Sequence, residues 1–84
     1  ITIEEGIRSI AGKAFFFCDG LTNITIPDSV TRINYSAFDG CKGLRSIHFK
    51  GTKAQWKAIS KGIWWNHNVP SSCKVVCTDG TVSI

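Results

Sequence analysis

The chain has 84 residues, of which 43% are hydrophobic and 19% charged, and its net charge is +4 at pH 7. This length allows one small domain with a thin core, and no apolar run comes near the ~20 residues that a membrane-spanning helix needs. The positive excess lies wholly in residues 47–84, where five lysines and no arginine face a single acidic residue. Because base readout favours arginine, nucleic acid is not an expected partner.

The first residues, "ITIEEGIRSIAGKAFFFCDGL", contain no methionine and no basic-then-apolar leader. We therefore expect the chain to be a piece of a longer protein, with any targeting signal outside it. The same pattern returns at an offset of 23 residues in "ITIPDSVTRINYSAFDGCKGL". Nine residues are identical at this offset: Ile1/Ile24, Thr2/Thr25, Ile3/Ile26, Ile10/Ile33, Ala14/Ala37, Phe15/Phe38, Cys18/Cys41, Gly20/Gly43 and Leu21/Leu44.

A period of 20 to 29 residues with the apolar spacing L-x-x-L-x-L is typical of leucine-rich repeats, in which one strand per turn stacks on the next. Leu21, Ile24 and Ile26 have this spacing. The pattern predicts a β-rich leucine-rich-repeat solenoid of the right-handed β/α superhelix type. Residues 23 apart should then lie directly over one another, so that Phe15 contacts Phe38.

The elements of one repeat follow in order along residues 24–46. A strand over residues 24–26 should end at the Pro-Asp-Ser of residues 27–29, because proline cannot donate to a strand ladder and Asp and Ser favour turns. Val30 and Ile33 then return to the core. Residues 37–38 should form a short turn that places a phenyl ring under the stack.

Residues 47–84 begin as a partial third repeat and then depart from the pattern. Thr52 and Gln55 have the spacing of a capping box, so a short helix should begin after Thr52. Gly62 is the expected C-cap of this helix. The residues expected on its buried face are Trp56, Ile59 and Ile63.

Asp79-Gly80, between β-rich flanks, predicts a β-hairpin with a type I′ turn. Helix and hairpin together should cap the open end of the core, because a solenoid needs an atypical terminal unit. The chain is thus expected to be a single domain, with repeat 1 at residues 1–23, repeat 2 at 24–46, and a partial repeat and C-terminal cap at 47–84.

Cys18 and Cys41 are equivalent in the two repeats and would lie in neighbouring layers about 4.8 Å apart, within the range that a disulfide tolerates. Stacked side chains point in parallel, however, and a thiol repeated once per turn is typical of a small buried residue. Two reduced, buried thiols are therefore favoured over a disulfide.

Cys73 and Cys77, with His48 and His67, are the one candidate metal site. Along an extended segment the two sulfurs would lie ~13 Å apart, too far for a zinc knuckle. A nucleophilic arrangement of Cys77, His67 and Asp79 lacks any pattern that supplies an oxyanion hole. Neither a metal, nor another cofactor, nor a catalytic residue is expected.

Trp64 and Trp65 lie in a loop with Asn66, His67 and Asn68. Such a loop could be a sugar-stacking platform or an anchor for a protein partner. Adjacent side chains seldom both face inward, so the favoured interpretation packs one indole under the helix beside Trp56 and leaves the other accessible.

"LTNITIPDSVTRINYSAFDGC" (residues 21–41) resembles the repeat of the BspA-like leucine-rich-repeat proteins of bacterial surfaces, and "GTKAQWKAISKG…VVCTDGTVSI" resembles the cap that commonly ends them. The chain departs from this pattern in the first repeat, at Gly6-Ile7 and at Phe16-Phe17. The resemblance implies an extracellular or cell-surface bacterial scaffold that adheres to a host or matrix protein or to another surface protein. It carries no catalytic residues, so the chain is expected not to be an enzyme.

The solvent-facing positions of the stacked strands are the expected binding surface, because solenoids recurrently bind on this side. The candidate residues there are Asn23, Thr25, Arg45, Ser46, His48 and Lys50. The alternative function is a non-catalytic appendage of a surface enzyme that recognises a glycan through Trp64 or Trp65. The strand at residues 1–3 would also be an open edge through which the isolated chain could self-associate.

Overall fold

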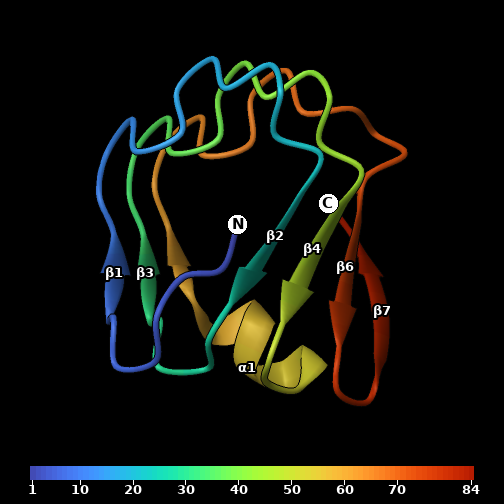
Figure 1. Cartoon of the computed structure of the whole chain (residues 1–84). Helices are drawn as coiled ribbons and strands as arrows, with labels where there is room; N and C mark the ends of the chain where they lie inside the picture. The colour runs from blue at the N-terminus through green and yellow to red at the C-terminus, as the bar shows by residue number, and fades with distance from the viewer.

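Successive turns of the chain add strands to two facing sheets in the computed structural model, which describes all residues, 1–84. The first sheet is parallel and has the order β1–β3–β5, formed by Ser9–Ile10, Arg32–Ile33 and Ser60–Lys61. The second has the order β2–β4–β6–β7, formed by Asn23–Ile26, Ser46–Phe49, Lys74–Cys77 and Gly80–Ser83. Helix α1 is Lys53–Ala58. Figure 1 shows the two sheets opposite each other, with turns across the top and α1 at the lower end. This β-rich arrangement of parallel strands with one short helix is consistent with leucine-rich repeats.

Residues 23 apart are paired in both sheets. Ile24 is the partner of Ile47 in the second sheet, and Ile10 is the partner of Ile33 in the first. A single bridge between Thr2 and Thr25 extends the second sheet toward the N-terminus. The rings of Phe15 and Phe38 are stacked, with centroids 5.3 Å apart and an interplanar angle of 4°. The predicted stacking of equivalent residues is therefore confirmed.

The core lies between the two sheets, because alternate residues of each strand point inward. In β2, for example, Ile24 and Ile26 are completely buried while Asn23 is exposed. Phe38 is also completely buried, and Trp65 packs against it edge-on with ring centroids 6.4 Å apart. Burying one such apolar side chain contributes roughly 1.5–3 kcal/mol, so a column of them is the main source of stability.

The offset between paired residues rises from 23 to 28 in the third turn. Ile33 pairs with Lys61, and Ile47 pairs with Val75. The extra residues lie in the connection between β4 and β5, where α1 stands in place of the short turn of the preceding layer. The layers therefore stay in register although the chain between them is longer.

Helix α1 begins as predicted. Thr52 is its N-cap and accepts a hydrogen bond from the Gln55 amide, while the Gln55 side chain accepts one from the Thr52 amide. Trp56 is buried on the side of the helix that faces the core. The capping box is therefore confirmed.

The end of α1 differs from the prediction, which placed the C-cap at Gly62 and buried Ile63. The helix ends at Ala58, its C-cap is Ile59, and the side chain of Ile63 is 67% exposed. Lys61 replaces the glycine cap, because its Nζ donates hydrogen bonds to the carbonyl oxygens of Trp56 (2.7 Å) and Ile59 (3.2 Å). Gly62 serves close packing instead, since a Cβ there would lie 2.6 Å from the backbone nitrogen of Tyr35.

The predicted hairpin is formed by β6 and β7, but its turn type was predicted wrongly. Cys77 pairs with Gly80, so the two loop residues are Thr78 and Asp79. Neither has the positive φ that a type I′ turn requires at both positions. The turn is instead fastened to the start of the helix, where Asp79 Oδ1 accepts a hydrogen bond of 2.8 Å from the Lys53 amide.

Candidate interaction surfaces

The outward-facing side chains of β2, β4, β6 and β7 form one continuous surface, here called the strand face. The pairing of strands places these side chains in two rows across the sheet. The first row is Asn23, Ser46, Lys74 and Ser83, and the second is Thr25, His48, Val76 and Thr81. The structure thus brings together four of the predicted residues, namely Asn23, Thr25, Ser46 and His48.

The strand face carries basic side chains and no acidic ones within its two rows. His48 is exposed, and its Nε2 lies 3.2 Å from Ser46 Oγ. Arg45, also exposed, directly precedes β4, and its carbonyl oxygen accepts a hydrogen bond from the Lys74 amide. Lys74 was missed from the sequence because it aligns with Ser46 at the longer offset of 28 residues.

Lys50, the remaining predicted residue, stands apart from this group. Its Nζ lies 3.5 Å from Glu5 Oε1, and both side chains are well exposed. An exposed ion pair of this kind contributes only about 0–1 kcal/mol, because water screens it and the long side chains lose freedom. Lys50 therefore adds less net charge to the surface than Arg45 or Lys74.

A second surface, here called the turn edge, consists of the stacked turns at residues 12–17, 35–40 and 63–68. In Figure 1 these turns cross the top of the molecule. Eight large hydrophobic side chains of the chain are exposed, and five of them belong to this edge: Phe16, Phe17, Tyr35, Ile63 and Trp64. Clustered exposed apolar groups are uncommon on soluble proteins and often mark contact sites.

The turn edge requires a left-handed backbone at the same two positions of each turn. At the first position Lys13, Ser36 and Trp64 have φ of 58°, 51° and 60°. At the second position the residues with positive φ are Phe17, Gly40 and Asn68. Phe17 thus keeps the turn conformation of the glycine that it replaces, at a strain of roughly 1–2 kcal/mol, and its ring covers Gly40 of the next layer.

The two adjacent tryptophans separate as the sequence suggested, one inward and one outward. Trp65 is half-buried and packs edge-on against Trp56, with ring centroids 5.8 Å apart. Lys61 Nζ lies over both indoles, 4.7 Å from the Trp56 centroid and 5.9 Å from that of Trp65. Trp64 is 60% exposed, and its nearest aromatic partner is His67, at 5.9 Å between ring centroids.

All four cysteines are free thiols. Cys41 is completely buried and its Sγ donates to the carbonyl oxygen of Phe15 at 3.0 Å; burial raises the pKa of this thiol to about 11. Cys18 is only half-buried, which corrects the expectation that both thiols are shielded. It lies in the first layer, which is covered by a neighbouring layer on one side only. Burial also raises the pKa of the Cys73 thiol and of the Cys77 thiol. No group of three or more His, Cys, Asp or Glu side chains lies close enough together to hold a metal ion.

A family model described as a BspA type leucine rich repeat region (6 copies) matches residues 1–76. Comparison with curated proteins and with solved structures finds no match. The single helix, α1, falls far short of the length and apolarity needed to cross a membrane. Repeats of the matched type are typical of bacterial surface proteins, generally mediate protein interactions and are typically non-catalytic.

Proposed function

The chain belongs to the family of BspA-type leucine-rich-repeat proteins, and on this premise we propose that it is a non-catalytic adhesion module of a secreted or surface-exposed bacterial protein. It binds a host or matrix protein, or another surface protein, and performs no chemical reaction. Its architecture is a short right-handed solenoid with a C-terminal cap. Residues 1–23 and 24–46 are its repeats, and residues 47–84 are its partial repeat and cap.

The strand face is the surface that we assign to this function. Its two rows consist mainly of short polar side chains, with Lys74 in the first row and Arg45 directly before β4. They offer hydrogen bonds and positive charge without an acidic side chain to repel a partner. Charge complementarity of this kind steers association and selects partners. The absence of acidic residues from both rows is the observation that carries the proposal, and it favours an acidic segment of the partner protein.

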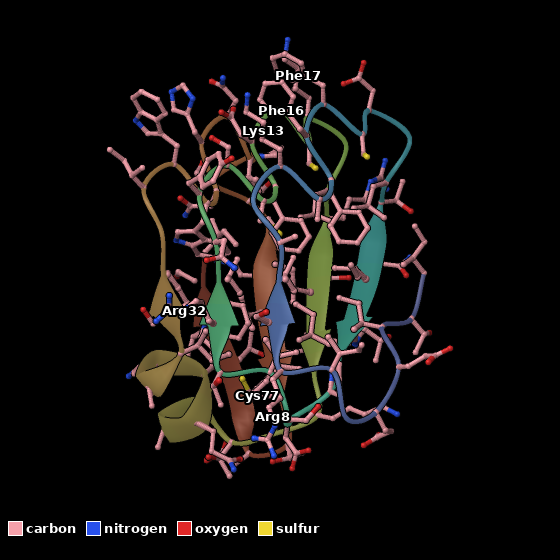
Figure 2. All side chains as sticks on the ribbon, turned by 90° about the vertical axis from the view of Figure 1, so that its left-hand side faces the viewer. Arg8, Lys13, Phe16, Phe17, Arg32 and Cys77 are labelled. Carbon is pink, nitrogen blue, oxygen red and sulfur yellow. The ribbon has the colours of Figure 1, made fainter.

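The proposal is tested by binding to a panel of purified extracellular matrix proteins, measured by surface plasmon resonance. We expect Arg45→Ala/Lys74→Ala to weaken binding at least tenfold, because both charges leave the surface that meets the partner. Arg8→Ala/Arg32→Ala removes the same net charge from elsewhere and should bind normally. Figure 2 shows Arg32 on the three-stranded sheet and Arg8 near the lower end of the molecule.

Equal weakening by the two double variants would show that only net charge matters and would contradict a site on the strand face. Binding of the parent chain should also fall with added salt, since exposed charges are screened beyond about 8–10 Å at physiological ionic strength. If no protein of the panel binds the parent chain, the adhesion proposal fails.

A further inference from the structure

Trp64 presents its indole outward because the backbone on both sides of it is held. The Ile63 carbonyl oxygen accepts a hydrogen bond of 3.0 Å from the Ser36 amide in the neighbouring layer. The Trp64 carbonyl accepts one of 3.1 Å from the His67 amide. The left-handed φ of 60° that the turn requires is unfavourable for tryptophan, so this side chain is displayed at a cost in strain.

Polar groups from two layers lie beside this indole. The His67 ring is 5.9 Å from Trp64, and its Nδ1 lies 3.3 Å from Asp39 Oδ1, a carboxylate whose side chain is only 11% exposed. Asn68 Nδ2 lies 3.4 Å from the same His67 nitrogen. Hydrogen-bond donors and acceptors are therefore placed at the rim of an exposed aromatic ring.

The other aromatic side chains of the turn edge do not share this arrangement. Phe16 is stacked on Phe17 with centroids 4.3 Å apart, and Lys13 Nζ lies 5.0 Å from its centroid. Figure 2 shows these three side chains grouped at the top of the molecule. Tyr35 lies on Gly12, where a Cβ would be 2.7 Å from its Cζ. Each of these rings thus packs against a neighbour on one side, and no hydrogen-bonded polar cluster adjoins them.

We propose that Trp64, with His67 and Asn68 beside it, binds neutral oligosaccharides built from pyranose rings with equatorial substituents, such as β-linked glucose or N-acetylglucosamine. Such rings have a flat apolar C–H face that can pack on an indole and a rim of hydroxyl groups that can hydrogen-bond to imidazole and carboxamide. No lysine or arginine takes part in the hydrogen bonds of this cluster, and Asp39 would repel an acidic sugar. The site lies on the turn edge and does not depend on the role proposed for the strand face.

The test uses chitotetraose and cellotetraose as probes, with tryptophan fluorescence and isothermal titration calorimetry as readouts. Trp56 is buried and Trp65 is half-buried, so the long-wavelength part of the emission belongs to Trp64. At least one probe should shift this emission to shorter wavelength. Trp64→Asn should abolish the shift and weaken binding at least tenfold, while Trp64→Phe should retain part of the affinity. Asparagine tolerates the left-handed backbone, so the first variant is expected to fold.

Phe16→Ala is the matched control, because it removes an exposed aromatic ring from the same edge without touching the polar cluster. Normal binding by this variant, together with loss in Trp64→Asn, supports the proposal. Failure of both probes to bind the parent chain overturns it, as does equal loss in Phe16→Ala. Loss of sugar binding in Arg45→Ala/Lys74→Ala, with Trp64→Asn unaffected, would overturn it by moving the sugar site to the strand face.

Discussion

At the scale of single residues, Cys41 shows how burial makes a thiol inert. Its side chain has no exposed surface, and the neutral thiol donates to the Phe15 carbonyl. Burial raises the pKa of Cys41 from 9.0 to about 11, so the reactive thiolate is almost absent at neutral pH. Such a cysteine can stay unpaired even under oxidising conditions, because the reactive thiolate is scarcely populated.

We expect Cys41 to lower the stability of the fold in alkaline solution. Between about pH 9 and pH 11 the unfolded chain releases the Cys41 proton while the folded chain retains it, so the unfolded state binds fewer protons. The free energy of unfolding must then fall as pH rises through this window. Urea unfolding of the parent chain and of Cys41→Ala, under reducing conditions from pH 8 to pH 11, measures the difference in slope.

Lys61 acts in the opposite direction but does not disturb this comparison. Burial lowers the pKa of Lys61, so the folded chain loses that proton first, and this group makes stability rise with alkaline pH. Because Lys61 is present in both proteins, its effect cancels in the difference. Identical slopes in the parent chain and in Cys41→Ala would contradict the role assigned to the thiol.

At the scale of elements, the stacked turns approach one another too closely to admit a side chain at some positions. Gly20 and Gly43 are equivalent in the repeat, and neither has a positive φ. A Cβ on Gly43 would lie 2.7 Å from the carbonyl oxygen of Asp19, whereas a Cβ on Gly20 would meet nothing within 4 Å. Close packing between layers therefore requires glycine at position 43, whereas a side chain at position 20 would meet no neighbouring atom.

Gly43→Ala should destabilise the chain by about 1–3 kcal/mol, because the added methyl group meets backbone atoms that cannot rotate away. Gly20→Ala, the matched control, should be neutral or stabilising by up to about 1 kcal/mol, since alanine lowers the entropy of the unfolded chain. Both values follow from urea denaturation at pH 7. Equal effects of the two substitutions would mean that the layers do not approach as closely as described.

Helix α1 depends on its surroundings in the same way. A helix of six residues is too short to be stable by itself in water. It is held at its start by the capping box and by Asp79, and at its end by Lys61, which reaches back from β5. Hydrogen bonds thus join the helix to the hairpin turn and to the third layer at the C-terminal end.

At the scale of the whole molecule, the second sheet ends at residues 1–3 in an open edge. Thr2 bridges Thr25 through two hydrogen bonds, in which the Thr25 amide donates to the Ile1 carbonyl and the Ile3 amide donates to the Thr25 carbonyl. The amide and carbonyl of Thr2 itself therefore point away from the sheet. Beside them, the side chain of Ile1 is 67% exposed.

We expect the isolated 84-residue chain to associate through this edge, since unpaired strand edges readily accept another strand. Thr2→Pro should suppress association, because it removes the outward amide without breaking either hydrogen bond to β2. Multi-angle light scattering over a range of concentrations measures the effect. Thr81→Ala, on the strand face and away from this edge, serves as the control. A parent chain that stays monomeric at every concentration would refute the prediction.

The amino-acid sequence by itself determined the features that repeat or that depend on neighbours along the chain. The identities at an offset of 23 predicted the pairing of Ile24 with Ile47, the stacking of Phe15 on Phe38 and the alignment of Thr25 with His48. The capping box could be identified because its two hydrogen bonds join residues three apart. The domain division and the binding role of the strand face stay predictions.

Only the tertiary structure decided which residues become neighbours where adjacent layers contain different numbers of residues. The helix inserted in the third turn changes the offset to 28. The capping box marks where this helix begins, but it does not show how many residues pass before the strands pair again. This is why Lys74 was missed on the strand face, why Gly62 was mistaken for a helix cap, and why nothing indicated which of two adjacent tryptophans faces outward. Equal spacing can be extrapolated from one layer to the next, whereas the partners of an irregular turn are set by packing in three dimensions.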